Sequence, residues 1–438
     1  MSLAIAGADV QVRGYVAEGI RVRRKSTDLY GGSHGEGTYP DALRATAHPA
    51  GLATYFEVVV GPGAAVGTLT GSLRVGAREI PVSLAIATAT LPALGVTRVW
   101  AYEDPRELAW QRDPGAADPD RAVPSADERA CVAMFREHGV LLSPDLDLAW
   151  WPARRSLLVG TTDVPVVIPT DPALAAEAVR GWIAATQGTG QVPFAIPYDE
   201  PADAATRAKL RALGDAAHAA GAGPTTFRVA VTDEPRAEYG AAVDLYISWK
   251  AAHREGDRVA RWTYNGAPPF AGSVVLDAVA PGTRTWGWIG WRYDIATWYV
   301  WDALYWHDRY NRHGAALPGR PLHVDTDATS FDGGEDHGNL DGVLALPGAG
   351  PDGSPDGSPT GGCRPTLRLA SIRRGLQDRQ LLEAAARCNA AATAAIASAL
   401  FPVALADARP GARASWPADD AIFELARRQL VTIASCPR

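Results

Sequence analysis

The sequence predicts an α/β fold: a (β/α)8 barrel of the TIM type, with an N-terminal β-sandwich domain and C-terminal helices. Three observations indicate it. Short strand-like runs with frequent turns fill the first 95 residues, about eight apolar runs then alternate with helical stretches, and two helical patterns end the chain. With 438 residues, the chain is long enough for more than one domain. We expect the sandwich over 1–95, the barrel over 96–380 and a helical tail over 381–438.

The first domain is predicted from strand periodicity. Residues 10–13 and 20–23 alternate apolar and polar side chains, as half-buried strands do. Three further runs follow at 55–60, 68–75 and 80–87, separated by glycine-containing turns. Several short strands with closely spaced turns are typical of a β-sandwich, so we expect a small accessory domain of that kind.

The barrel is predicted from a change of rhythm near residue 97. Apolar runs that end in acidic residues or proline alternate there with alanine- and arginine-rich helical stretches such as 202–219. Repeated strand–helix units imply a parallel sheet with right-handed crossovers, and about eight of them imply a barrel with its site at the carboxyl ends of the strands. The expected strands are 97–102, 139–142, 192–197, 226–231, 243–247, 259–264, 285–291 and 342–346.

The C-terminal part begins with a low-complexity segment, 348–362, in which PDGS occurs twice. We expect an exposed loop. It contains a literal GxGxxG, but prolines interrupt it and no helix opens there, so we do not expect a dinucleotide site. Beyond it, helices are expected over 371–399 and 419–434, with Asp419 capping the second.

Charge and hydropathy exclude several partners. The net charge is −7 and the pI about 5.8, which argues against nucleic acid because phosphate binding needs basic patches. No run approaches the roughly 20 apolar residues of a membrane span. The N-terminus lacks the basic and apolar pattern of a signal peptide, so we expect either a cytoplasmic protein or a trimmed form of a longer chain.

No metal ion or cofactor is expected. The chain lacks HExxH and zinc-site spacings, and the acidic segment 332–337 lacks the spacing of an EF-hand loop. Cys131 and Cys363 are scattered. Cys388 and Cys436 fall in the two C-terminal helices, where a disulfide and two inert thiols are both open interpretations.

The strongest local signal for chemistry is the motif Tyr198-Asp199-Glu200-Pro201, which directly follows a predicted barrel strand. Pro201 ends the ladder and turns the backbone, so both carboxylates can face one pocket at the rim of the barrel. Two close carboxylates repel, which raises the pKa of one and keeps it protonated as a general acid. The other interpretation is a helix start, with proline at its first position and the acids at the positive end of the dipole.

A second motif, Thr232-Asp233-Glu234-Pro235, repeats this pattern after the next strand. Its carboxylates would lie on the same face of the barrel, which makes Asp233 and Glu234 reserve candidates.

Aromatic residues give a further signal. The chain has 14 tryptophans, and six of them fall within 21 residues, interleaved with tyrosines. Some of these rings must pack the barrel, and two or three are expected to line a cleft, where flat, rigid rings bind sugars. The cluster comprises Trp286, Trp288, Trp291, Tyr293, Trp298, Tyr299, Trp301, Tyr305 and Trp306.

Several of these features, with others, stand in a distinctive order. They are residues 55–71, the motif at 198–201, the aromatic segments 262–265, 287–293 and 305–306, and a C-terminal signature at 341–348 and 367–369 with Arg373, Gly375 and Asp378. As a set, over about 50–390, they resemble the proteins related to glycoside hydrolase family 123, including the group called domain of unknown function 4091. The chain departs from that pattern at Thr297-Trp298-Tyr299, where relatives carry glycine, and in its expanded loop at 348–362.

The resemblance implies retaining β-N-acetylgalactosaminidase chemistry with substrate assistance, in which the 2-acetamido oxygen attacks the anomeric carbon. Carried over by position, Asp199 orients the acetamido group and Glu200 is the general acid/base. The expected partner is an oligosaccharide or polysaccharide, and such a substrate suggests a secreted or cell-surface protein. The substrate-binding residues expected beside this pair are Tyr198, Trp249, Tyr264, Asn265, Trp291, Tyr293 and Trp301.

Two alternatives to this mechanism stay open. One is a glycosidase of other specificity that uses two separate carboxylates, for instance Glu200 with Asp233 or Glu234. The other is a barrel protein that binds carbohydrate without turnover.

Overall fold

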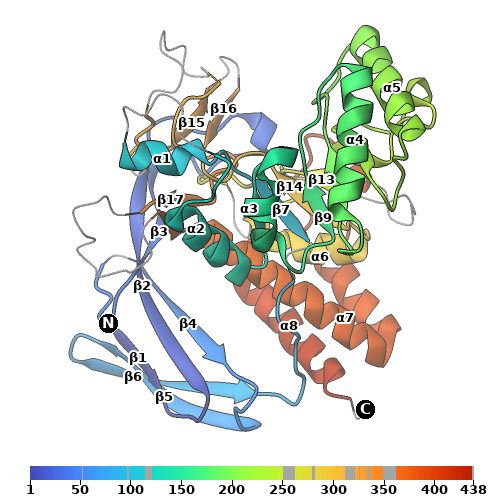
Figure 1. Cartoon of the computed structure of the whole chain (residues 1–438). Coiled ribbons are helices and arrows are strands. Elements are labelled where there is room, and N and C mark those ends of the chain that lie inside the picture. Colours follow the sequence, from blue (N-terminus) through green and yellow to red (C-terminus); the bar gives the residue numbers. More distant parts are fainter. Residues whose placement is uncertain are drawn as a thin grey trace.

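The structure is a computed structural model that describes residues 1–51, 53–95, 98–113, 121–249, 262–278, 282–310, 321–324, 326–332, 336–348 and 362–436. Most of the low-complexity segment at 348–362 lies outside these ranges. Figure 1 shows N-terminal strands that form a layer of their own beside the barrel, and two long C-terminal helices that pack against it.

Eight parallel strands form the barrel, and they follow one another around the ring in chain order. The paired strands run from β8 through β7 and β14 back to β9, and backbone pairing of Leu146 with Val166 closes the ring between β8 and β9. The predicted barrel is therefore confirmed. The strands are β7 (Val99–Tyr102), β8 (Leu141–Ser143), β9 (Asp163–Pro165), β10 (Val192–Ala195), β11 (Arg228–Val231), β12 (Leu245–Trp249), β13 (Trp262–Tyr264) and β14 (Thr297–Val300).

Two predicted barrel strands are wrong. Residues 285–291 belong to helix α6 (Thr285–Arg292), and part of 342–346 belongs to β17 (Ala345–Pro347), which pairs with β18 (Cys363–Pro365) outside the barrel. Strands β9 and β14 take the two places instead. In α6 the alternating tryptophans spread around a helix, and Gly287 lies so close to Gly375 that a Cβ there would overlap the Gly375 carbonyl.

Helices cover the outside of the barrel. Their N-termini carry the expected caps: Asp171 accepts from Ala173 N in α4, Asp203 accepts from Thr206 N in α5, and the predicted cap Asp419 accepts from Ala421 N in α8. Among the described residues, none of these helices is long and apolar enough to cross a bilayer. They are α1 (Arg106–Arg112), α2 (Ala126–Glu137), α3 (Trp151–Arg154), α4 (Pro172–Thr186), α5 (Ala204–Ala219), α6, α7 (Leu367–Leu400) and α8 (Asp420–Ala434), with 3-10 turns at Asp28–Tyr30, Leu148–Trp150, Arg155–Leu158, Ala237–Tyr239, Gly282–Arg284 and Leu405–Asp407.

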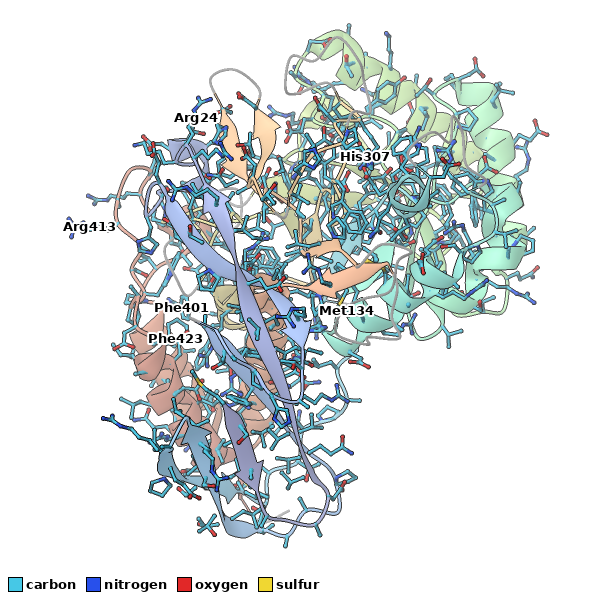
Figure 2. All side chains as sticks on the ribbon, turned by 90° about the vertical axis from the view of Figure 1, so that its left-hand side faces the viewer. Arg24, Met134, His307, Phe401, Arg413 and Phe423 are labelled. Atoms are coloured by element: carbon cyan, nitrogen blue, oxygen red, sulfur yellow. A yellow bond between two sulfur atoms is a disulfide. The ribbon has the colours of Figure 1, made fainter. Side chains whose placement is uncertain are left out.

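The C-terminal helices α7 and α8 pack on α6 and on each other. Helix α7 starts before the predicted residue 371 and breaks at Asn389, where the backbone leaves helical angles. Phe401 contacts both Trp288 of α6 and Phe423 of α8, with ring centroids 6.1 and 5.7 Å apart, and Figure 2 shows Phe401 and Phe423 side by side. The predicted domain boundary at 380 falls inside α7 and stays a prediction.

The N-terminal domain consists of two three-stranded antiparallel sheets, ordered β1-β5-β6 and β3-β2-β4. The runs predicted at 10–13 and 20–23 belong to one 13-residue strand, β2, with a bulge at Glu18/Gly19. The strands are β1 (Ser2–Ile5), β2 (Val10–Val22), β3 (Gly37–Ala45), β4 (Thr54–Val60), β5 (Gly67–Val75) and β6 (Arg78–Ile86), and a further hairpin, β15 (Thr329–Asp332) with β16 (His337–Asn339), lies beyond the barrel strands.

All four cysteines form disulfides. Cys388 and Cys436 join α7 to the end of α8, so the disulfide interpretation of that pair is the one the structure adopts. A second bond, between Cys131 of α2 and Cys363 of β18, links segments 232 residues apart. A cross-link of this kind typically contributes about 2–4 kcal/mol to stability.

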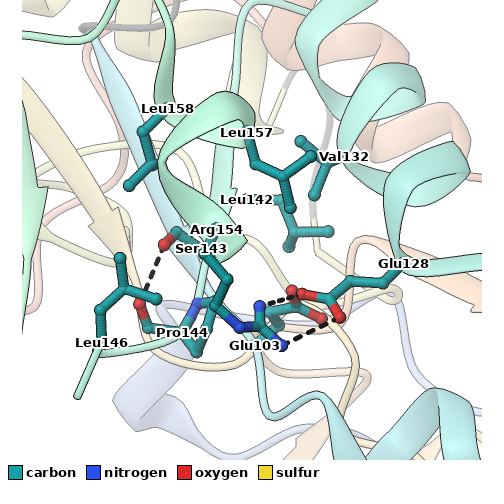
Figure 3. Close-up of a pocket in the computed structure, with 10 residues that line it drawn as sticks. All are labelled: Glu103, Glu128, Val132, Leu142, Ser143, Pro144, Leu146, Arg154, Leu157 and Leu158. Carbon is teal, nitrogen blue, oxygen red and sulfur yellow. Dashed lines mark hydrogen bonds and ion pairs between the residues drawn. The ribbon is translucent and has the colours of Figure 1, made fainter. Parts of the chain in front are cut away.

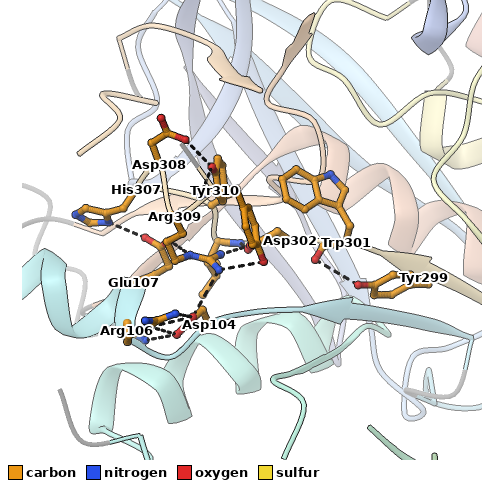
Figure 4. A network of polar contacts seen from close by, with 12 residues as sticks. Asp104, Arg106, Glu107, Tyr299, Trp301, Asp302, His307, Asp308, Arg309 and Tyr310 are labelled. Carbon is orange, nitrogen blue, oxygen red and sulfur yellow. Dashed lines mark hydrogen bonds and ion pairs between the residues drawn. The ribbon is translucent and has the colours of Figure 1, made fainter. Parts of the chain in front are cut away.

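A buried ion network joins the carboxyl ends of β7 and β14 (Figure 4). Arg309 contacts Asp302, which follows β14, donates from Nε to Glu107 Oε1 at 2.6 Å, and lies 3.5 Å from Asp104, which follows β7. Burial raises the pKa of Asp302 to about 7, although the Arg309 cation opposes that shift. The network therefore holds this part of the barrel rim in one arrangement.

A second buried carboxyl lies just outside the barrel wall. Glu103 is fully buried beside the Arg154–Glu128 ion pair, and both of its oxygens lack a hydrogen-bond donor among the described residues. These groups line a cavity of about 10 Å³, room for one water molecule (Figure 3). Burial, and then the charge of Glu128, raise the pKa of Glu103 well above its ordinary value.

Glu103 is therefore expected to cost stability at neutral pH. The pKa of Glu103 is higher in the folded than in the unfolded protein. Its contribution to the free energy of unfolding is therefore fully present below about pH 4.5, the pKa in the unfolded chain, and is lost as the pH rises toward the folded-state pKa. Glu103→Gln cannot ionise, so we expect it to raise the free energy of unfolding by about 1–3 kcal/mol at pH 8. Urea unfolding of the parent and of Glu103→Gln at pH 5 and pH 8 checks this. A gain in the free energy of unfolding that is larger at pH 5 than at pH 8 contradicts it.

Candidate active site

The barrel interior is filled by aromatic rings below the carboxyl ends of its strands. Trp100 of β7 stacks on Tyr299 of β14 with centroids 4.4 Å apart, and meets Phe194 of β10 edge-on at 5.1 Å. Phe194 in turn contacts Trp262 of β13 at 5.0 Å. This layer gives the mouth of the barrel a solid floor, as side-chain layers do in barrels of this size.

Asp199 and Glu200 lie above this floor, four and five residues after β10, and both are exposed. The hydroxyl of Thr232, which follows β11, holds the pair together. It donates to Asp199 Oδ1 at 2.6 Å and accepts from the Glu200 backbone N–H, also at 2.6 Å. One side chain from the neighbouring strand thus orients one carboxylate and the backbone of the other.

The backbone at Glu200 explains how adjacent residues serve one site. Glu200 has a φ of 41°, in the left-handed region that non-glycine residues rarely adopt. Helix α5 begins only at Ala204, with Asp203 as its cap, so Pro201 is not at the first helical position. The helix-start interpretation of the motif is therefore wrong, and the sharp turn resembles those that store strain at functional sites.

Tyr264, at the end of β13, approaches from across the mouth. Its hydroxyl donates to Glu200 Oε1 at 2.7 Å. Burial, and then the hydrogen bond to Glu200, raise the pKa of Tyr264, so it stays a donor. Trp249, at the end of β12, meets the Tyr264 ring edge-on with centroids 5.2 Å apart.

Asn265 and Trp301 also belong to this rim. Asn265 has a φ of 49°, its backbone N–H donates to the Tyr299 carbonyl at 3.0 Å, and its buried Oδ1 has no donor among the described residues. Trp301, directly after β14, donates from Nε1 to Asp341 Oδ2 at 3.0 Å. Tyr198 is half-buried and packs on the cluster of aromatic and aliphatic side chains below the mouth.

The structure does not bring Trp291 and Tyr293 to this mouth. Both lie at the end of α6, just before β14 begins and so at the opposite end of the barrel. Tyr293 is buried, and its hydroxyl accepts from the Ala404 backbone N–H at 2.8 Å. A strand over 285–291 would lead toward the mouth, whereas helix α6 leads to the other end of the barrel.

The reserve pair has other partners. Asp233 accepts from Arg236 Nε at 2.7 Å and from the Tyr239 hydroxyl. Burial alone would raise the pKa of Asp233, but these hydrogen bonds from Arg236 and Tyr239 hold it below its ordinary value. Asp233 is therefore an ionised group committed to an ion pair, while Glu234 is exposed.

Sequence patterns missed three kinds of site residue. In the sequence, Thr232 stands out only as the neighbour of Asp233 and Glu234. Tyr102 ends β7, a strand that the sequence does predict, whereas Tyr299 lies in β14, a strand that it does not. Asp145, two residues after β8, lies in an ordinary-looking Ser-Pro-Asp segment, and only the rule that barrel sites lie at strand ends points to it.

A search of solved structures finds this architecture in a family 123 glycoside hydrolase from Clostridium perfringens, studied for the details of glycolipid glycan hydrolysis. The two chains are 11% identical, the match covers 99% of this chain and 88% of that one, and the TM-score is 0.59. This chain has that enzyme's fold. The predicted resemblance to family 123 is confirmed at the level of the fold, sandwich and barrel included.

Other comparisons add little. A family 2 glycosyl hydrolase from Bacteroides cellulosilyticus DSM 14838 matches with a TM-score of 0.31 and 12% identity, over 68% of this chain and 41% of that one. A β-glucuronidase from Parabacteroides merdae gives 0.27 and 11%, over 67% and 43%. No family model and no curated protein matches the sequence. Within the described ranges, no group of three or more His, Cys, Asp or Glu is placed to hold a metal ion.

Proposed function

We propose that this protein is a retaining glycoside hydrolase that cleaves β-linked N-acetylhexosamine, N-acetylgalactosamine first among them. The observation that carries the proposal is the Asp199–Glu200 pair, held by the Thr232 hydroxyl at the carboxyl ends of the barrel strands. Catalytic residues of TIM barrels come from these strand ends. The fold shared with a family 123 glycoside hydrolase supports the same class of reaction.

In the proposed mechanism Glu200 protonates the leaving glycosidic oxygen while the substrate's acetamido oxygen attacks the anomeric carbon. The bond to the leaving group breaks, and an oxazolinium ion forms. Asp199 accepts the acetamido N–H and offsets the positive charge that develops there. Glu200 then removes a proton from water, which attacks the anomeric carbon from the face that the leaving group occupied. The bond between that carbon and the acetamido oxygen breaks, which restores the acetamido group, and the configuration is retained.

Neighbouring side chains have positioning roles in this scheme. Thr232 keeps the Asp199 carboxylate aimed at the acetamido group, and the Tyr264 hydroxyl keeps the Glu200 carboxyl in place between turnovers. The rings of Trp249 and Tyr264 offer flat surfaces for a sugar. Tyr198, Asn265 and Trp301 complete the proposed set of substrate contacts.

The two-carboxylate alternative has less support. It needs Asp233 or Glu234 as a partner for Glu200. Asp233, however, already accepts hydrogen bonds from Arg236 and Tyr239. A general base of that kind should be free to take up a proton.

We also propose that the protein works outside the cytosol. Two disulfides use every cysteine of the chain, and such bonds form and persist mainly in oxidising compartments. A polymeric or cell-surface glycan is a substrate found there.

The first experiment is turnover of 4-nitrophenyl N-acetyl-β-galactosaminide, with the N-acetyl-β-glucosaminide and the β-galactoside measured beside it. We expect hydrolysis of an acetamido sugar with retention of the anomeric configuration, and no hydrolysis of the β-galactoside. NMR identifies the anomer that is released first. Equal turnover of the β-galactoside contradicts substrate assistance. Binding of N-acetylgalactosamine without turnover of any substrate favours the non-catalytic alternative.

Thr232 gives a prediction of its own. Thr232→Val removes the hydroxyl that joins Asp199 to Glu200, so we expect kcat/KM to fall about 10–100-fold through the loss of two hydrogen bonds. Thr232→Ser keeps the hydroxyl and should retain most of the activity. Steady-state kinetics on the same aryl substrate check this, and a valine variant as active as the serine variant contradicts it.

A further inference from the structure

The carboxyl of Asp145 stands at the mouth of the barrel on a rigid stretch of backbone. On one side, Ser143 pairs in register with Tyr102 of β7, and its carbonyl accepts from Trp100 Nε1 at 3.3 Å. On the other, Leu146 N–H donates to the Pro165 carbonyl and Leu146 O accepts from Val167 N–H, both at 3.0 Å. Asp145 is therefore fixed between two strands.

The side chain of Asp145 faces the barrel interior. Leu142, Ser143, Pro144 and Leu146 line the small cavity outside the wall, toward α2 (Figure 3), whereas Asp145 does not. The charge of Asp145 acts on Tyr299, whose ring stacks on Trp100 inside the barrel, so Asp145 points inward. That is the side on which the aromatic floor and the Asp199–Glu200 pair lie.

The groups that face Asp145 are Tyr102 from β7, Tyr299 from β14 and Asp199 beyond β10, and its neighbour β9 continues into the apolar residues 166–168. In the described part of the chain, Asp145 has no hydrogen bond to its carboxyl and no cation beside it. Burial, and then the charge of Asp199, raise the pKa of Asp145 to about 7. Asp145 is only partly buried, so its carboxyl remains accessible to a ligand that supplies the hydrogen bonds it lacks.

We propose that Asp145 contacts the sugar directly, as a neutral carboxylic acid that donates to one hydroxyl of an uncharged ring and accepts from a neighbouring one. The inference rests on the proposed glycosidase function.

Kinetics test the contact. Asp145→Ala loses both hydrogen bonds, so KM for the aryl N-acetylgalactosaminide should rise about 10–100-fold with a smaller change in kcat. Asp145→Asn can donate and accept but never ionises, so it should keep near-parental KM at pH 6. It should also lack the fall in activity above pH 7 that we expect of the parent. Asp147→Asn, a matched control that keeps its capping bond to Ala149 N–H, should change neither KM nor the pH profile. An asparagine variant as impaired as the alanine variant at every pH overturns the proposal.

Unfolding of the sugar-free protein supplies a readout that does not depend on activity. A folded-state pKa of about 7 means that the stability contributed by Asp145 is lost as the pH rises from about 4 to 7. Asparagine does not titrate, so the Asp145→Asn variant loses no stability at this position over the same pH range. The urea midpoints of the parent and Asp145→Asn should therefore differ more at pH 8 than at pH 5, in favour of the asparagine variant, and the same difference at both pH values overturns the neutral acid. If the parent hydrolyses no glycoside, the glycosidase proposal fails separately. Calorimetric titration of parent and Asp145→Ala with N-acetylgalactosamine then decides the contact, and equal affinity rejects it.

Discussion

Glu200→Gln is expected to lower kcat/KM for 4-nitrophenyl N-acetyl-β-galactosaminide by about 10²–10⁴-fold, the usual contribution of a positioned general acid. Glutamine has the same shape and still accepts from the Tyr264 hydroxyl, so the fold and the turn at 198–201 should be unchanged. What it cannot do is give a proton to the leaving oxygen or take one from water. Steady-state kinetics with circular dichroism as the check on folding measure the effect.

Substrates with different leaving groups show whether Glu200 acts as the general acid. A 2,4-dinitrophenyl glycoside departs with little help from an acid, so Glu200→Gln should slow its bond cleavage much less than that of the 4-nitrophenyl substrate. Glu234→Gln, the same change in the second Asp-Glu-Pro motif, is the matched control and should leave the rate near that of the parent. Loss of activity in Glu234→Gln, with Glu200→Gln still active, would move the catalytic role to β11.

Asp199→Asn should lower kcat on acetamido substrates by about 10²–10³-fold, as the loss of one preorganised electrostatic partner of a transition-state charge does. The amide cannot offset the positive charge of the oxazolinium nitrogen, and it can still accept from Thr232. Asp203→Asn, four residues further along, is a fair control because asparagine caps α5 as well as aspartate does.

Substrates with an altered acetamido group show whether Asp199 acts through it. Replacing N-acetyl by N-trifluoroacetyl makes the acetamido oxygen a weaker nucleophile. The kcat of the parent should therefore fall progressively as fluorine atoms are added to the acetyl group. If hydrolysis survives Asp199→Asn and is insensitive to fluorination, the acetamido group does not react, and a mechanism with two separate carboxylates takes its place.

The number and rhythm of barrel strands could be predicted from the sequence, but two of their positions could not. Short aromatic runs such as 285–291 satisfy a strand's alternation and also fit a helix whose glycines contact a neighbour, here Gly287 against Gly375. The three-residue strand β9, Asp163–Pro165, is too short to show any period. Contacts between elements decided both cases.

In the candidate site, too, residues that are adjacent in the chain could be found from the sequence, and residues from different strands could not. Asp199 and Glu200 are neighbours in the chain and follow a recognisable strand, so their motif fits both a site and a helix start, and the resemblance to family 123 favours the site. Their partners come from other strands: Thr232 is 33 residues from Asp199, and Tyr264 is 64 residues from Glu200. Trp291 and Tyr293 were assigned to the site because they follow one another like strand residues, and a helix carries them to the other end of the barrel.

By itself, the sequence determined the alternation that builds a barrel, the acidic pair at the end of β10 and the cap at Asp419. These are local properties, set by residue type and spacing within a few positions. Only the tertiary structure decided that Thr232 and Tyr264 hydrogen-bond to that pair, because closing eight strands into a ring brings together residues from strand ends that are far apart in the chain.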